Sequence, residues 1–362
     1  MKLTAVLVGC GAMSRKWLEA AQAIDDLDVV GLVDLDVERA RLRREEFLPA
    51  HCAISADLEA MLAEHRPDIV FDVVVPEARY GLVRTAFRYG CHVLSEKPMA
   101  DSLENAASLV DLARQAGRVH AVVQNRRYID GVRRIRHALA SGLIGDVTSV
   151  HSDFFLAPHF GGFREAMEHV LLLDMAIHTF DAARYIIDAL PQAVYCREVN
   201  PSNSWYAHGA SAFATFEFAG DVIYTYRGSW CADGLRTSWE SAWRIVGTRG
   251  TLTWDGDRAF RAERVTGPGI PTGSSARFSE VEASLLPPAG PCPSTGGHAG
   301  VMRDFIGALR GGPLPETVGS ENIKSLAMVF GAIESARSGA RVPIDPLAKR
   351  ETGASMPGLA AR

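Results

Sequence analysis

A lysine at the end of a buried strand is the first residue of this sequence that is placed for chemistry. His92 to Leu94 is a short apolar run that stops at Glu96-Lys97-Pro98. The proline lacks a backbone N–H and holds the residue before it extended, so the strand ends there and the Lys97 side chain keeps a fixed direction. Ligands bind at the carboxyl ends of parallel strands, which makes Lys97 a candidate catalytic residue. The alternative is an ordinary Glu-Lys-Pro turn on the surface.

An aspartate and a histidine four residues apart form a second group. Asp174 and His178 fall within the apolar stretch Val170–Ile187, which predicts a helix, and their spacing puts both side chains on one face. Such groups on an otherwise buried helix are costly unless they are paired or used. Two interpretations remain open at this point: an acid–base pair for catalysis, or a core histidine that is hydrogen-bonded to Asp174.

A glycine turn between a strand and a helix forms a third group. The apolar run Leu3–Val8 leads into Gly9-Cys10-Gly11-Ala12-Met13-Ser14 and then into an amphipathic helix. This order is the context that a dinucleotide-binding motif requires, with the pyrophosphate on the positive end of the helix. A glycine-rich turn without a ligand is the alternative. The residues expected to contact the cofactor are Gly9, Gly11, Ala12 and Met13.

An acid after the next strand indicates which dinucleotide binds. Val29–Val33 is apolar and ends in Asp34, about 20 residues past the glycine turn. A carboxylate there accepts hydrogen bonds from the adenosine ribose and repels a 2′-phosphate, so the sequence predicts NAD and disfavours NADP. Asp36 is the alternative for this role. Four arginines that could attract a phosphate follow, and we interpret them as a solvated helix face: Arg39, Arg41, Arg43 and Arg44.

Alternating strands and helices around these groups predict a doubly wound parallel sheet, a Rossmann domain, in residues 1–123. Its remaining predicted strands are Ile69–Val75, which ends at Pro76, and Val119–Val123. The predicted helices beside them are Arg79–Tyr89 and Ser102–Ala116.

A different pattern predicts an α+β domain in residues 124–345, built on a largely antiparallel open sheet. Its predicted strands are Val147–Phe155, Ala210–Phe218, Val222–Trp230, Ser241–Val246 and Gly250–Trp254. Its predicted helices, besides Val170–Ile187, are Gly131–Ser141, Gly300–Leu309 and Ser320–Ser338. Residues 156–168 are expected to be irregular, 265–299 to be a long exposed excursion, and 346–362 to be a disordered tail.

Composition argues against several classes of partner. The chain has 362 residues, 47% of them hydrophobic, a net charge of −5 and a pI of about 6.1. These values give no reason to expect nucleic acid or an anionic membrane as partner, and no apolar run approaches the ~18 residues of a membrane span. Six scattered cysteines without metal-like spacing indicate reduced thiols, no metal site and a cytoplasmic protein.

Together these motifs resemble those of the Gfo/Idh/MocA family, named after glucose–fructose oxidoreductase, inositol dehydrogenase and a rhizopine-catabolism protein. The resemblance covers nearly the whole chain, and its most specific part is Glu-Lys-Pro combined with Asp-x-x-x-His. It is carried by Gly9-Cys10-Gly11, Gly90-Cys91-His92-Val93, Ser95-Glu96-Lys97-Pro98, Asp174 with His178, Arg127-Tyr128, Ser141-Gly142-Leu143-Ile144-Gly145 and Val246-Gly247-Thr248-Arg249-Gly250-Thr251-Leu252.

The resemblance implies an oxidoreductase in which Lys97, Asp174 and His178 are catalytic. Hydride would pass from the carbinol carbon of a sugar or polyol to the nicotinamide while His178, with a pKa near neutrality, takes the hydroxyl proton. Lys97 would hold the developing alkoxide, and Asp174 would orient the imidazole or bind a neighbouring hydroxyl. Pro76, Glu96 and Lys97 would also contact the cofactor. The family's open C-terminal sheet implies a homodimer or homotetramer.

Two departures from the family pattern affect the substrate pocket. Tyr80 stands where the family usually has a histidine, and Glu168-His169-Val170 stands where it usually has a glycine-rich run. These bulkier residues would change the pocket wall, so no particular substrate follows from the resemblance. Candidate substrate-binding residues are Arg164, His169 and Tyr128, with His159, Trp205 and Tyr206 as further candidates, and each could equally be a packing or surface residue.

Three functions agree with the sequence. The favoured one is an NAD(P)-dependent dehydrogenase or reductase acting on CH–OH groups of a sugar, cyclitol or related polyhydroxy compound. The second is a glycosidase-like enzyme of the same family that retains NAD and uses transient oxidation without net redox change. The third is a non-catalytic dinucleotide-binding protein, against which the combined presence of Lys97, Asp174 and His178 argues.

Overall fold

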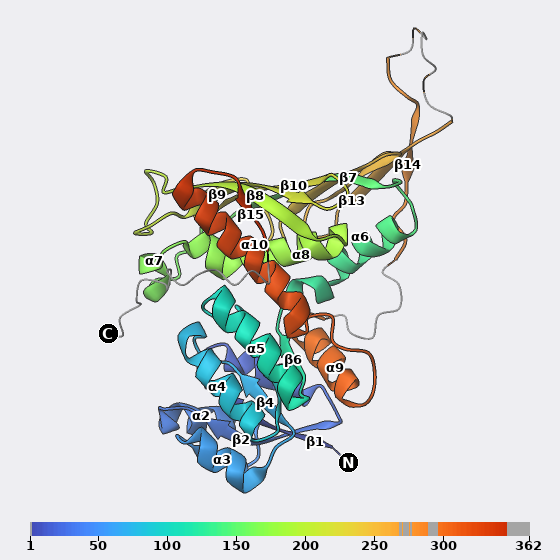
Figure 1. The fold of residues 1–362 in the computed structure, drawn as a ribbon. Helices are drawn as coiled ribbons and strands as arrows, with labels where there is room; N and C mark the ends of the chain where they lie inside the picture. Colours follow the sequence, from blue (N-terminus) through green and yellow to red (C-terminus); the bar gives the residue numbers. More distant parts are fainter. Residues whose placement is uncertain (1, 268–269, 271–274, 276, 289–295, 346–362) are drawn as a thin grey trace.

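The N-terminal part of the chain forms a parallel sheet (Figure 1). The computed structural model describes residues 2–267, 270, 275, 277–288 and 296–345, and the statements below concern these. The strands are β1 (Leu3–Val8), β2 (Leu27–Val33), β3 (Ala53–Ser55), β4 (Ile69–Asp72), β5 (His92–Ser95) and β6 (His120–Val122). Their order, β3-β2-β1-β4-β5-β6, is that of a dinucleotide-binding sheet, so this part of the fold prediction is confirmed.

Both faces of this sheet are buried because successive side chains of a strand point to opposite sides. Ala5 and Leu7 of β1 belong to a core that includes Trp17 of α1, whereas Val6 and Val8 belong to the core that includes Val83 of α4. The helices of this domain are α1 (Ser14–Gln22), α2 (Val37–Phe47), α3 (Leu58–His65), α4 (Pro76–Arg88) and α5 (Leu103–Ala116).

The end of β4 differs from the prediction. The strand stops at Asp72 and α4 begins at Pro76, so the predicted strand end at Val75 and helix start at Arg79 were wrong. Proline is favoured at the first position of a helix, where its missing N–H would have no partner, so Pro76 opens α4 instead of merely stopping a strand.

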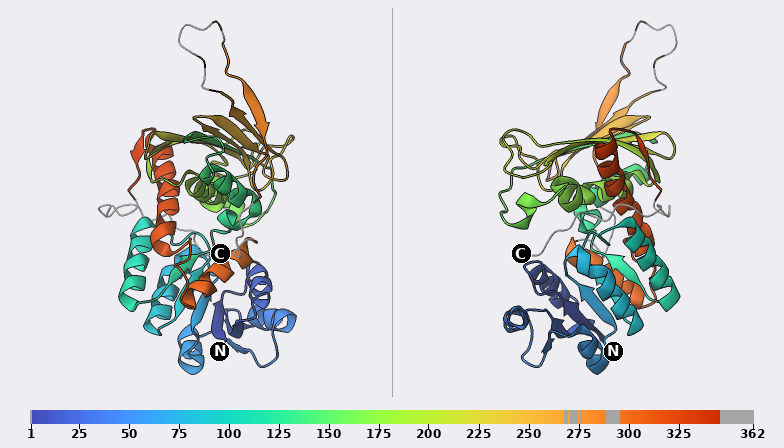
Figure 2. Two further views of the ribbon diagram at one scale, coloured as in Figure 1. Left: turned by 90° about the vertical axis from the view of Figure 1, so that its right-hand side faces the viewer. Right: turned by 60° about the vertical axis from the view of Figure 1, so that its left-hand side comes forward.

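The second domain is a nine-stranded sheet with helices on one face (Figures 1 and 2). Its strand order is β14-β13-β12-β11-β7-β10-β9-β8-β15, antiparallel except for the pair β7 and β10, which confirms a largely antiparallel sheet. The strands are β7 (Val147–Phe155), β8 (Pro191–Val199), β9 (Ser211–Phe218), β10 (Val222–Ser229), β11 (Ala242–Gly247), β12 (Gly250–Trp254), β13 (Phe260–Val265), β14 (Val281–Ser284) and β15 (Val342–Pro343).

The helical segments of this domain begin with the short connection after β6. They are η1 (Asn125–Tyr128, a 3₁₀ helix), α6 (Asp130–Ala140), α7 (Phe163–Ala166), η2 (Leu171–Ala176, a π-helix), α8 (Ile177–Ile187), α9 (His298–Leu309) and α10 (Gly319–Ser338). Among the described residues, no helix has the length and apolarity needed to cross a membrane.

Five strands were missed from the sequence: β3 of the first sheet and β8, β13, β14 and β15 of the second. β14 lies within the predicted exposed excursion, residues 265–299, and is largely exposed as expected, but its pairing with β13 was not predicted. These strands are largely exposed and carry little apolar alternation, which removes the sequence signal. The side chains of β8 largely alternate between buried and exposed, but the strand begins with Pro191, and proline weakens the sequence signal for a strand. Part of the excursion (268–269, 271–274, 276 and 289–295) and the tail 346–362 lie outside the described residues.

A buried network of ion pairs joins three segments of the second domain near its junction with the first. Arg127 of η1 donates to Asp181 of α8 through Nε at 2.8 Å, and the Ser325 hydroxyl of α10 donates to the same carboxylate at 2.6 Å. Asp181 is fully buried. In addition, α9 returns to the first domain, where Phe305 packs into the same core as Trp17. The catalytic candidates on the two domains are therefore held in a fixed relation.

Candidate active site

The glycine turn after β1 leaves room for a phosphate group. Gly9 has a φ of +96°, and a Cβ there would meet the Val73 carbonyl oxygen at 2.7 Å, so only glycine fits. A Cβ on Gly11 would meet nothing within 4 Å, and Gly11, Ala12 and Met13 are exposed. The positive end of α1 follows, without a side-chain cap. These residues fit the pyrophosphate of a dinucleotide.

Asp34 lies beside this turn at the end of β2. Its Oδ2 accepts the Cys10 N–H at 2.7 Å and its Oδ1 accepts the Asp36 N–H at 2.9 Å. A carboxylate can accept about four hydrogen bonds, so capacity remains for two ribose hydroxyls. Asp36, the alternative, caps α2 by accepting the Glu38 N–H, which is a structural role.

The four arginines of α2 are engaged within the protein. Each donates to a carboxylate or a backbone carbonyl, as expected for a solvated helix face with local ion pairs rather than a phosphate site. The contacts are Arg39–Asp36, Arg41–Glu38, Arg43–Glu46 and Arg44–Cys52.

Replacing Asp34 by alanine is expected to weaken NADH binding by about tenfold or more and to reduce the preference over NADPH, because two charge-assisted hydrogen bonds and one repulsive charge are lost. Calorimetric titration with both cofactors measures this. Asp36→Ala is the matched control and should change helix stability but not cofactor preference. If only Asp36→Ala alters the preference, the ribose role belongs to Asp36.

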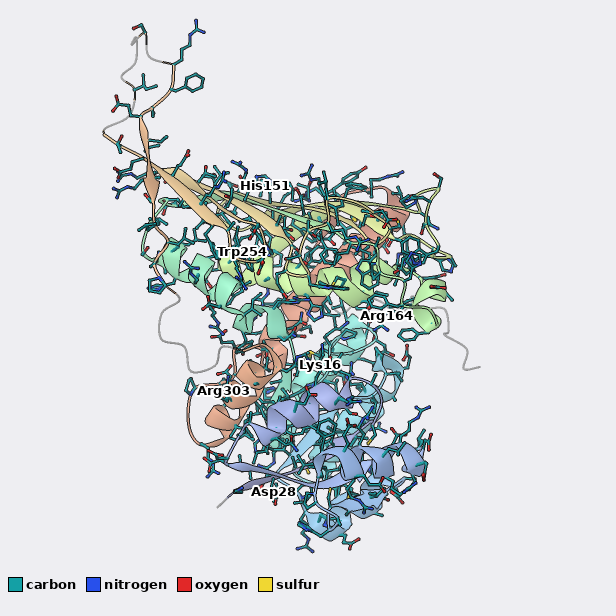
Figure 3. The ribbon with its side chains drawn as sticks, turned by 180° about the vertical axis from the view of Figure 1, so that it is seen from behind. Lys16, Asp28, His151, Arg164, Trp254 and Arg303 are labelled. Carbon is teal, nitrogen blue, oxygen red and sulfur yellow. The ribbon has the colours of Figure 1, made fainter. Side chains whose placement is uncertain are left out.

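Lys97 reaches from the end of β5 to the segment that carries Asp174. Its Nζ donates to the Asp174 carbonyl oxygen at 2.7 Å and to Oδ1 at 2.8 Å, and Arg164 Nε donates to Oδ2 at 2.7 Å. Figure 3 shows Arg164 on the side of the second domain that faces the first. Although burial opposes ionisation, the charges of Lys97 and Arg164 hold the pKa of the Asp174 carboxyl well below its usual range. The structure thus brings together three residues predicted to belong to the site, Lys97, Asp174 and Arg164.

Asp174 lies in a π-helical turn. The predicted helix Val170–Ile187 exists, but its first part, η2, has i→i+5 bonding, which widens the turn. Among the described contacts no hydrogen bond joins Asp174 to His178: the Asp174 oxygens accept from Lys97 and Arg164, and His178 Nδ1 has no partner. The interpretation of a histidine bonded to its own aspartate was therefore wrong.

Glu96 is a buried carboxylate behind Lys97. It accepts the Trp17 indole N–H at 2.8 Å and the Lys97 backbone N–H at 3.0 Å, and His298 Nε2 lies 3.6 Å away. Burial alone would raise the pKa of Glu96, but its contacts with His298 and Trp17 and the charge of Lys97 lower it. Glu96 fixes the backbone of Lys97, and its predicted contact with the cofactor, like that of Pro76, stays a prediction.

The imidazole of His178 is neutral. Burial lowers its pKa well below the ordinary value, and the positive charges of Lys97 and Arg126 act in the same direction. The expected pKa near neutrality was therefore wrong. A neutral imidazole is nevertheless the form that accepts a proton, so His178 can act as a base at physiological pH.

The buried histidines should make stability depend on pH. Burial lowers the pKa of His120 to about 3, and its Nε2 lies 3.0 Å from the Ser95 hydroxyl. The unfolded chain binds the proton near pH 6.5 and the folded protein does not, so stability is complete above that pH and falls as the pH drops toward 3. Between pH 7 and 5 we expect His120 alone to cost about 2 kcal/mol.

Urea unfolding at pH 7, 6 and 5 tests this pH dependence in the wild type and in His120→Gln, which can still bond to Ser95. The variant should lose part of the slope, because the carboxylates with lowered pKa values respond mainly at more acidic pH. An unchanged slope in His120→Gln would assign the effect to other groups.

The remaining candidates have partners other than Lys97 and Asp174. Tyr128 is fully buried, and its hydroxyl donates to Asp304 at 2.6 Å, so in this structure it packs rather than faces a ligand. His169 Nδ1 contacts Glu198 Oε2 of β8 at 2.5 Å. The further candidates form an aromatic group in which His159 stacks on Trp205 at 3.6 Å between ring centroids.

Residues near His178 that sequence reasoning missed are Arg126, Trp239, Glu240 and His298. Arg126 and Glu240 form an ion pair, and both line a small cavity with His178 and Trp239. Arg126 precedes the Arg127-Tyr128 motif and could have been found there. Glu240 and His298 are brought in by tertiary structure alone and carry no local signal.

Two family models match this chain. Residues 3–124 match the Gfo/Idh/MocA oxidoreductase family model, described as an NAD-binding Rossmann fold, and residues 132–253 match that family's C-terminal domain. The chain belongs to the Gfo/Idh/MocA family. The resemblance inferred from motifs, the enzyme class and NAD as cofactor are thereby confirmed.

Full-length relatives of this Gfo/Idh/MocA protein support the assignment. An uncharacterized protein, y4oX, from Sinorhizobium fredii is 29% identical over 361 residues, covering 96% of this chain and 98% of its own. The D-apiose dehydrogenase of Paraburkholderia graminis is 28% identical, covering 94% and 89%.

Solved structures show the same fold. An oxidoreductase from Agrobacterium radiobacter, in complex with NAD⁺, L-tartaric acid and magnesium, has a TM-score of 0.82 at 22% identity, covering 95% of this chain and 99% of its own. The WlbA dehydrogenase of Bordetella pertussis, in complex with NADH and UDP-GlcNAcA, has a TM-score of 0.75 at 21% identity and the same coverage.

Proposed function

We propose that this NAD-dependent oxidoreductase transfers hydride between the cofactor and a carbinol carbon of a sugar, cyclitol or related polyhydroxy compound. The observation that carries the proposal is the Lys97–Asp174 pair, only 15% and 16% exposed, at the carboxyl end of a strand of the NAD-binding sheet. Relatives named as sugar and inositol dehydrogenases support the substrate class.

In this proposal three residues divide the chemistry, and NAD supplies the hydride acceptor. His178, which is neutral, takes the hydroxyl proton of the substrate. Lys97 donates a hydrogen bond to the developing alkoxide, in a site where burial strengthens that interaction. Asp174 holds Lys97 in place and remains ionised, so it can accept a hydrogen bond from a neighbouring hydroxyl. Arg164 and His169 are the proposed substrate contacts, and Tyr128 is not included because it is buried.

The experiment that tests this proposal begins with a cofactor inventory. Purified protein is denatured, released NAD(H) and NADP(H) are quantified, and the cofactor-free protein is titrated with each. Reversible binding followed by NAD reduction with a sugar or cyclitol supports the proposal. Stoichiometric NAD that does not exchange, with cleavage of glycosides, would support the glycosidase-like cycle instead. Binding without turnover on either panel would support a non-catalytic role.

The outer face of the second sheet is the proposed subunit interface. It carries a depression of ≈ 790 Å³ whose lining includes His151, Tyr195 and Phe213, with Tyr195 45% and Phe213 43% exposed. Figure 3 shows His151 on this face, away from the first domain. Exposed aromatic residues on an uncovered sheet face favour association, so we propose a homodimer or homotetramer. The scattered cysteines support the separate proposal that the protein is located in the cytoplasm. The domain division at residues 123 and 124 likewise stays a prediction.

A further inference from the structure

A small cavity lies behind the imidazole of His178. Its volume is ≈ 10 Å³, about that of one water molecule. Arg126 of η1, His178 of α8 and Glu240, which precedes β11, contribute polar side chains to its lining. The other lining residues are mostly apolar: Val132, Met175, Thr179, Ala182, Trp239 and Trp243.

Three buried polar atoms of these lining residues have no hydrogen-bond partner within the described structure. They are Arg126 Nε, His178 Nδ1 and Glu240 Oε2. Arg126 and Glu240 already pair through Arg126 Nη1 and Glu240 Oε1, and the Trp243 indole donates to the Glu240 carbonyl at 2.8 Å, which fixes the position of Glu240. An unsatisfied buried polar group costs about 1–3 kcal/mol, so three around one cavity are unfavourable unless a shared molecule satisfies them.

One water molecule has the donors and acceptors needed to satisfy all three atoms. Arg126 Nε–H can only donate and the Glu240 carboxylate can only accept, so the water accepts from the first and donates to the second. His178 Nδ1–H can then donate to the second lone pair of the water. The Lys97 ammonium, which does not line the cavity, disfavours a second proton on the ring, so Nε2 keeps its lone pair when Nδ1 carries the hydrogen.

We propose that Arg126 and Glu240, through one water in this cavity, hold His178 as the Nδ1–H tautomer and leave Nε2 free to take the proton of the substrate hydroxyl. Arg126 and Glu240 are thus positioning residues. The role of Nε2 in catalysis rests on the proposed function, whereas the Nδ1–H tautomer of His178 does not depend on it. The charged groups acting on His178 are Lys97, Arg126, Asp174 and His298, and Glu240 lines the same cavity.

The test is NMR of the NAD-bound protein labelled with ¹⁵N-histidine, in which the nitrogen shifts report the tautomer and His178→Ala assigns the signal. The decisive variant is Arg126→Met with Glu240→Leu, which removes the pair without leaving an unpaired buried charge. We expect the Nδ1–H form in the wild type and the Nε2–H form in the double variant. Its kcat should fall by about tenfold or more, with KM changed little.

Two further variants separate positioning from a general loss of packing. Glu240→Gln keeps an acceptor oxygen and should retain the wild-type tautomer and a kcat within about threefold. Arg133→Met with Glu316→Leu removes another ion pair, between Arg133 of α6 (9% exposed) and Glu316 before α10 (37% exposed), and should leave the His178 signal unchanged. The proposal is overturned if the double variant keeps the Nδ1–H form and the wild-type kcat. It is also overturned if the tautomer of His178 changes in the double variant while kcat does not. If the wild type oxidises no polyhydroxy compound, the proposed function fails while the tautomer comparison still decides the hydrogen bonding.

Discussion

Replacing Lys97 by alanine is expected to lower turnover by about a hundredfold or more while cofactor binding changes little. In the proposed mechanism Lys97 donates to the developing alkoxide, and its loss also releases one oxygen of Asp174. The fold should survive, since Asp174 keeps its bond to Arg164. Single-turnover kinetics with saturating NAD and substrate measure the chemical step, and titration with NADH measures binding.

Lys324→Ala provides the matched control for Lys97→Ala. Lys324 is 24% exposed and paired with Glu321 on α10, so it resembles Lys97 in burial and charge but lies on another element. Its replacement should leave turnover unchanged. Turnover of Lys97→Ala within a few-fold of the wild type would remove Lys97 from the mechanism, and an equal loss in both variants would point to a general loss of stability.

Replacing Asp181 by alanine is expected to destabilise the protein by about 3–5 kcal/mol, because the buried Arg127 guanidinium loses its carboxylate. Arg184, 3.9 Å away, and the Ser325 hydroxyl lose the same partner. Urea unfolding at pH 7 measures the free energy. Asp111→Ala is the matched control: Asp111 pairs with Arg114 on the surface of α5, where the two side chains are 63% and 75% exposed, so its loss should cost less than about 1 kcal/mol. Equal costs in the two variants would show that burial does not set the strength of the Asp181 network.

Much of the first domain could be predicted from local signals. Gly9, Asp34 and Lys97 each occur where an apolar run meets a residue that fixes backbone geometry, and these boundaries survive in the structure. The pairing of Lys97 with Asp174, however, joins residues 77 positions apart, and no periodicity encodes such a contact. For Asp174 and His178 the sequence predicted a shared helix, but it could not show that the carboxylate turns to Lys97.

Other features depend on tertiary environment. Tyr128 resembled a pocket residue because a polar aromatic side chain suits a polyol, yet burial against Asp304 makes it part of the core. Glu240 lies 62 residues beyond His178 in the sequence, and only the approach of the segment before β11 to α8 brings the two to one cavity. The pKa of His178 likewise depends on burial and on Lys97, neither of which composition reveals.

The π-helical turn η2 has a consequence for how the protein can change during evolution. A π turn contains one residue more than the α turn it replaces, and such turns persist mostly where function requires them. Deleting one residue from Leu171–Ala176 would restore a regular helix and rotate Asp174 relative to Lys97, even with Lys, Asp and His all still present in the chain. The length of this segment is therefore constrained as strictly as its residue types. A relative with the full motif but a shorter segment should be expected to lack this Lys97–Asp174 contact.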